Sequence, residues 1–169
     1  MQSINLLVIF LVSFIPLVIG FVWYNPKVFG TIWMHETGMT EEKAKETNLF
    51  MIFGITFLMS FLFAFALQFS VVHQFHIFSV LQNEVGFAEK TGDAYADLTY
   101  FMTKYGHNFI SFKHGAIHGF IGSVFTYLPI ITINSLLEKK SIKYILITFG
   151  YWTLSAILMG GFICQFTKF

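Results

Sequence analysis

Four long stretches without a charged residue constrain this 169-residue sequence more than any other feature. They cover residues 1–26, 47–83, 114–137 and 144–167. A helix needs ~20 apolar residues to cross a ~30 Å bilayer core, so each stretch is long enough to cross once. Charged residues make up only 11% of the chain, against ~25% in a typical soluble domain. The pattern therefore predicts an all-α integral membrane protein, a single domain over 1–169 with transmembrane helices at about 4–23, 49–72, 115–137 and 144–165.

The lysines predict the orientation of these helices. Six lysines lie in the first and third connections, at 27–45 and 139–143, whereas the opposite side carries Lys90, Lys104, Lys113 and Lys168. Because lysine is enriched in cytoplasmic loops, this bias predicts that both termini lie outside the cytoplasm. The first stretch starts without Lys or Arg and has no small-residue cleavage site, so we expect it to remain as a membrane anchor.

The connection between the second and third spans has helical periodicity of its own. Apolar residues recur at Tyr95, Leu98, Met102 and Tyr105, and Gly106 ends the pattern. This spacing predicts an amphipathic helix from Asp93 that lies on the outer membrane surface. The second charge-free stretch is longer than one crossing needs, so we expect its helix to continue into the headgroups with two histidines on it.

Histidines gather at the predicted outer ends of spans two and three. His73 and His76 are three residues apart and His114 and His118 four apart, so each pair projects from one face of a helix. Two such helices side by side offer four imidazoles to zinc, copper or iron. One histidine from each helix is the alternative, as axial ligands of haem. The other interpretation is that the histidines lie at the interface and pair helices by hydrogen bonds.

Two further residues on the same predicted side extend the candidate metal site. His107 precedes span three, and Glu84 supplies a carboxylate in the connection. Membrane desaturases and hydroxylases use about eight histidines in three boxes, and this chain has six histidines without adjacent pairs. We therefore do not expect a di-metal lipid-modifying enzyme.

Several short motifs resemble a bacterial membrane family catalogued as domain of unknown function 1761. The motifs are Trp23-Tyr24-Asn25-Pro26, Gly38-Met39-Thr40-Glu41-Glu42, Asn134-Ser135-Leu136-Leu137-Glu138-Lys139-Lys140 and Gly150-Tyr151-Trp152. The resemblance implies a four-span protein of the bacterial inner (cytoplasmic) membrane. It implies no activity and no catalytic residue.

Small residues on span three bear on the function. Gly115, Gly119 and Gly122 form a stripe where another helix can approach closely, either within the bundle or from a neighbouring protein. The leading hypothesis is a non-enzymatic membrane protein that associates laterally, as a homo-oligomer or as a subunit of a larger complex. A metal- or haem-binding protein is the second hypothesis.

A small-solute permease is the third hypothesis, although no charged residue lies inside any span. The expected partners are the lipid bilayer and either the protein itself or another membrane protein. Nucleic acid is not expected, because 10 lysines are balanced by 9 acidic residues.

Overall fold

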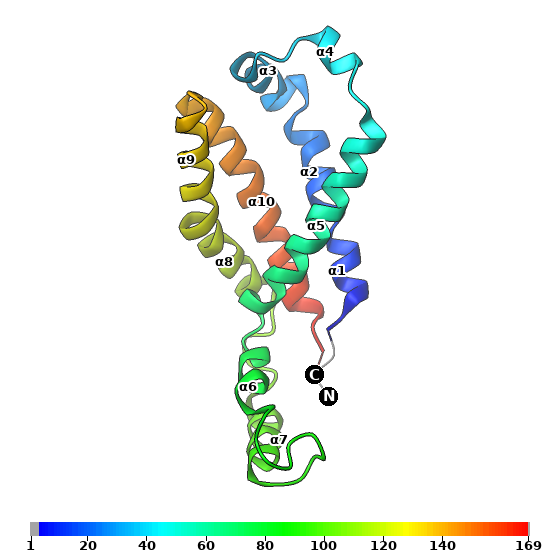
Figure 1. The fold of residues 1–169 in the computed structure, drawn as a ribbon, viewed down its shortest axis with the longest axis vertical. Helices are drawn as coiled ribbons and strands as arrows, with labels where there is room; N and C mark the ends of the chain where they lie inside the picture. The colour runs from blue at the N-terminus through cyan, green and yellow to red at the C-terminus, as the bar shows by residue number, and fades with distance from the viewer. Residues whose placement is uncertain (1–3, 169) are drawn as a thin grey trace.

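The computed structural model describes residues 4–168 of the chain, and within that range it contains helices and no strand (Figure 1). The helices are α1 Leu6–Val12, α2 Ile15–Trp23, η1 Pro26–Gly30, α3 Thr31–Thr37, α4 Glu41–Lys45, α5 Leu49–Val71, α6 Gln74–Leu81, α7 Asp93–Tyr105, α8 Phe112–Gly122, η2 Ser123–Tyr127, α9 Leu128–Leu137 and α10 Ile142–Phe166. The elements η1 and η2 are π-helical turns.

Four helical segments are long and apolar enough to cross a membrane, as the sequence predicts. They are Leu6–Trp23, Leu49–Val71, Phe112–Leu137 and Ile142–Phe166. The first consists of α1 and α2, and the third of α8, η2 and α9. The predicted span limits agree with these segments to within three residues.

The two ends of the described chain lie at the same end of the bundle. Asn5 Nδ2 donates a hydrogen bond to the Phe166 carbonyl oxygen over 3.5 Å. Figure 1 shows α6 and α7 at this end, beyond the four spans, whereas α3, α4 and the turn between α9 and α10 lie at the opposite end. This arrangement is the one that four successive crossings require.

Helix α10 forms the centre of the bundle. It contacts α8, α2, α5 and α1, and its buried residues include Met159, Ile163 and Cys164. The other spans turn large apolar side chains outward, as Phe50 does with 92% of its surface exposed. Such outward apolar faces explain how one small chain accommodates 23 phenylalanines when its solvent is hydrocarbon.

Glycines allow α8 and α10 to touch backbone to backbone. A Cβ atom on Gly115 would lie 2.6 Å from Cys164 Cβ, and one on Gly119 would lie 2.6 Å from the carbonyl carbon of Ala156. Both positions therefore exclude any side chain. The prediction of a three-glycine stripe is wrong at Gly122, where a Cβ would meet nothing within 4 Å.

The second span does not continue as one helix into the outer segment, contrary to our expectation. Helix α5 ends at Val71, Val72 is extended (φ −117°, ψ 93°), and α6 begins at Gln74. The Gln74 side chain is buried, and its Nε2 donates hydrogen bonds to the carbonyl oxygens of Gly106 (2.9 Å) and Asn108 (3.0 Å). These bonds hold the redirected chain against the segment that leads into α8.

The predicted amphipathic helix is present as α7 over the predicted residues. Its apolar residues Tyr95, Leu98 and Met102 line a cavity shared with Phe78 of α6. In Figure 1, α6 and α7 lie together beyond the end of the bundle. The apolar face of α7 is thus turned toward α6, and its position on a membrane surface stays a prediction.

Candidate metal centre

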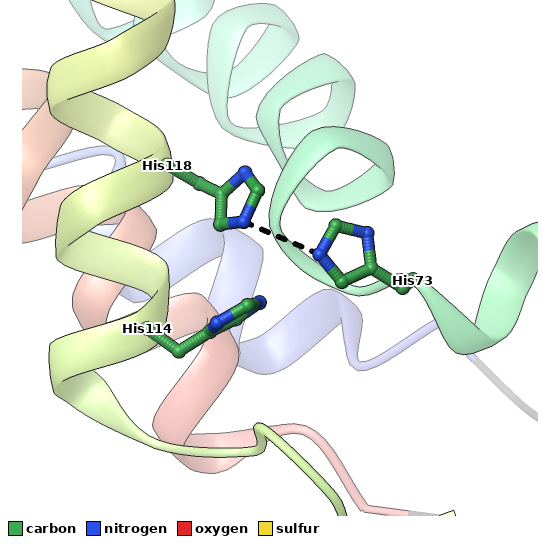
Figure 2. A group of neighbouring side chains, drawn as sticks. All are labelled: His73, His114 and His118. Carbon is green, nitrogen blue, oxygen red and sulfur yellow. Dashed lines mark hydrogen bonds between the residues drawn. The ribbon is translucent and has the colours of Figure 1, made fainter.

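Three of the six histidines converge at the junction between the bundle and the α6–α7 unit. His114 and His118 come from α8, and His73 comes from the break between α5 and α6 (Figure 2). One ring nitrogen from each lies within 4.8 Å of the other two. The ring centroids of the three pairs are 4.5 to 5.0 Å apart.

The start of α8 is fixed by polar contacts on both sides. Ser111 caps the helix, since its Oγ accepts a hydrogen bond from the His114 backbone N–H over 3.3 Å. The Phe112 backbone N–H donates to Gln165 Oε1 of α10 over 2.9 Å. Because residues four apart lie on one helical face, this anchored first turn presents His114 and His118 in the same direction.

His73 is positioned by the chain break rather than by a regular helix. It is the residue before α6, and the buried side chain of Gln74 anchors the following position. On the preceding side, the buried Cys164 thiol lies 3.6 Å from the Val71 carbonyl oxygen and 3.4 Å from that of Phe109. A thiol donates one weak hydrogen bond, so Cys164 links the end of α5 and the entry to α8 to the centre of the bundle.

Hydrogen bonds satisfy only some of the ring nitrogens of His73, His114 and His118. The Nε2 atoms of His73 and His118 are 3.2 Å apart, so one ring donates a hydrogen bond to the other, with the direction set by the tautomers. His114 Nε2 is buried and has no hydrogen-bond partner among the described residues. A buried polar atom left unpaired costs ~1–3 kcal/mol, so this nitrogen needs a partner that the described residues do not supply.

These separations are close to those of imidazoles on one metal ion. Zinc binds histidine nitrogen at ~2.0–2.1 Å, and tetrahedral angles then put neighbouring nitrogens ~3.3 Å apart. The His73–His118 pair meets this spacing at 3.2 Å, and the group as a whole lies within 4.8 Å. Binding of one ion would require the three rings to rotate until all their ligating nitrogens reach the shorter spacing.

The other predicted ligands are not part of this group. His76 is exposed on α6, and although its backbone N–H donates to the His73 carbonyl oxygen over 3.0 Å, its ring is not in the group with His73. His107 lines the cavity between α6 and α7, and Glu84 is exposed in the loop that follows α6. His35 lies in α3 at the opposite end of the bundle.

An all-helical chain with four membrane-capable helices is, by its architecture, a multi-pass membrane protein. Its sequence matches the family described as Protein of unknown function (DUF1761) over residues 7–164, so the chain belongs to that family. No curated protein and no solved structure matches the chain.

Proposed function

We propose that this membrane protein binds one transition-metal ion through His73, His114 and His118. Two observations support the proposal most directly: His114 Nε2 is buried without a hydrogen-bond partner among the described residues, and the His114 ring offers a nitrogen within 4.8 Å of a ring nitrogen on each of the other two histidines. Three imidazole ligands without thiolates favour zinc, copper or iron over calcium or magnesium. Three protein ligands also leave a coordination position for water or another small ligand.

The spacing favours a single ion over haem. Axial histidines stand on opposite faces of the porphyrin, with the iron and the macrocycle between them. The nitrogens of His73 and His118 are only 3.2 Å apart, and the third ring, His114, is 4.5 Å from His118 between centroids. Such a packed triangle of rings leaves no slot for a macrocycle.

Metal binding is tested on the full chain purified in a neutral detergent through an affinity tag that contains no histidine. We expect about one ion per chain by elemental analysis and a cobalt(II) absorption band of low-coordinate nitrogen ligation. Loss of a residue that only hydrogen-bonds to a metal ligand typically weakens metal binding ~10–100-fold. His114→Ala and His118→Ala should weaken it at least as much, and His76→Ala should leave the affinity unchanged.

The His76→Ala control has the same residue type and lies one helical turn from His73. Metal content well below one per chain in the parent would reject the site. Equal affinity losses in His76→Ala and His118→Ala would indicate nonspecific surface binding instead.

Lateral association and solute permeation remain predictions of the sequence alone. The glycines that motivated lateral association are engaged inside the chain at Gly115 and Gly119, where they contact α10. No contact among the described residues favours either hypothesis over metal binding.

For the setting of the protein, we propose the bacterial inner membrane with both termini outside the cytoplasm. The support is the lysine bias together with the placement of α7 and the described chain ends at one end of the bundle. The metal centre would then face the outer side, where it can exchange ions with the periplasm.

Cysteine labelling in intact cells tests this orientation. An impermeant thiol reagent is expected to modify Asp93→Cys at the start of α7 and not Lys140→Cys between α9 and α10. The parent protein is the background control, since its one cysteine, Cys164, is buried. Modification of Lys140→Cys without modification of Asp93→Cys would reverse the topology.

A further inference from the structure

The α6–α7 unit borders a half-open cavity that is separate from the group of His73, His114 and His118. Its volume is about 630 Å³, and its lining residues come from α6, α7, the loop that joins them and the segment after α7. Figure 1 shows α6 and α7 beyond the four spans. Ligand pockets in proteins typically measure ~300–1,000 Å³, so this cavity is large enough for a small organic molecule.

The wall of the cavity is built from aromatic and aliphatic side chains. Phe87 of the loop packs edge-to-face against Phe78 of α6 (centroids 5.4 Å apart) and against Tyr95 of α7 (5.9 Å), while Leu98 and Met102 complete the α7 side. Helix α7 has no buried residue even though it is amphipathic. The apolar face of α7 therefore borders empty space. In a protein interior such a face would normally be close-packed against other side chains.

The polar side chains that line the cavity are either positively charged or uncharged. Lys90 is the one charged side chain in the lining, and His107 and Thr103 offer further polar atoms. None of the acidic residues of the described loop and helix is in the lining, although Glu89 and Asp93 are close in sequence. An apolar chamber with a lysine and no carboxylate is complementary to an apolar chain that ends in an anion.

The loop backbone fixes Lys90 in this place. The Thr91 backbone N–H donates to the Gly86 carbonyl oxygen over 2.7 Å, and Gly86 and Gly92 both adopt positive φ. Lys90 itself has a φ of 59°, a left-handed conformation that few side chains other than Asn and Asp tolerate well. The lysine is held there by two flanking turns rather than by a helix.

We propose that this cavity binds a single long acyl chain with an anionic head, the chain between α6 and α7 and the head at Lys90. The unit joins the second membrane-capable helix to the third, and the proposal places it against the headgroup layer, where single-chain amphiphiles partition. Free fatty acids and lysophosphatidate share this chemistry.

Photolabelling of the full chain in nanodiscs of neutral phosphatidylcholine tests the proposal. A palmitate analogue with a diazirine in its chain is expected to label residues of α6 and α7, as mapped by mass spectrometry. Excess palmitate should suppress the labelling and dodecylamine, whose head is cationic, should not. If lysophosphatidate suppresses the labelling at a lower concentration than palmitate does, the cavity prefers a phosphate head to a carboxylate head.

Two variants test the head-group contact with little risk to folding. Lys90→Asn keeps a residue that tolerates the left-handed backbone, removes the charge, and should reduce labelling about tenfold, as expected for loss of a charge-assisted contact. Lys104→Asn is the matched control, because Lys104 is on α7 but does not line the cavity. Labelling confined to the four spans, equal competition by dodecylamine, or unchanged labelling of Lys90→Asn would each overturn the proposal.

Discussion

Gly119→Leu is expected to prevent the stable packing of α8 on α10. A Cβ at this position already overlaps the carbonyl group of Ala156, with 2.6 Å to its carbon and 3.0 Å to Ile157 Cα. Backbone cannot move aside as a flexible side chain can, so the two helices must separate. Overpacking in a core typically costs ~1–3 kcal/mol, and an overlap with backbone belongs at or beyond the upper end of that range.

Gly122→Leu is the matched control for this substitution. Gly122 is the last residue of the same helix, and a Cβ there meets nothing within 4 Å. Because glycine is a poor helix former, by ~1 kcal/mol relative to alanine, a leucine there is expected to be neutral or slightly stabilising. Thermal unfolding in detergent, followed by circular dichroism, compares the three proteins. Equal melting temperatures for both variants and the parent would show that the α8–α10 contact is not as close as described.

The packing at these glycines also explains why one part of the stripe was mispredicted. All three glycines lie within α8, so they keep their helical spacing, but only Gly115 and Gly119 touch α10, whereas Gly122 is the last residue before the π-helical turn Ser123–Tyr127. The wider turn and Pro129 after it change the direction of the span. Composition could identify the span, but not this local change in helical geometry.

The spans and α7 were predictable because their signals are local in the sequence. High hydropathy over ~20 residues predicts a membrane crossing independently of how the neighbouring helices pack. The period of apolar residues from Tyr95 to Tyr105 likewise reports a helix with one apolar face, and α7 covers Asp93–Tyr105. The helix against which the apolar face of α7 lies was not predictable, because its contact with α6 depends on the change of chain direction at Val72.

The group of His73, His114 and His118 was predictable only in part, for the same reason. The pair on α8 follows from spacing, since both histidines lie in one regular helix. The direction in which His73 and His76 leave α5 depends on the break at Val72, which neither glycine nor proline marks in the sequence. The break is stabilised by the contacts of Gln74 with Gly106 and Asn108, more than thirty residues away. Only the tertiary structure reveals such contacts.

Zinc is expected to raise the melting temperature of the parent protein and not that of His114→Ala. An ion held by His73 and His114 ties the α5–α6 break to α8, and binding to the folded state alone adds RT ln(1 + [L]/Kd) to the free energy of unfolding. At free zinc 100 times the Kd this term is about 2.7 kcal/mol, and at 1,000 times about 4.1 kcal/mol. His76→Ala should retain the full shift, because His76 is outside the group.

The same measurement separates a metal ligand from a helix-pairing histidine. If the 3.2 Å bond between His73 and His118 served only to pair helices, His118→Ala would lose about 0.5–1.5 kcal/mol whether or not zinc was present. A metal ligand adds a second, zinc-dependent difference between parent and variant that grows with the logarithm of the zinc concentration. Melting curves of the metal-free proteins, recorded with a chelator, give the first difference, and a zinc titration gives the second. A difference that stays constant across the titration would assign these histidines to helix pairing and exclude the proposed metal centre.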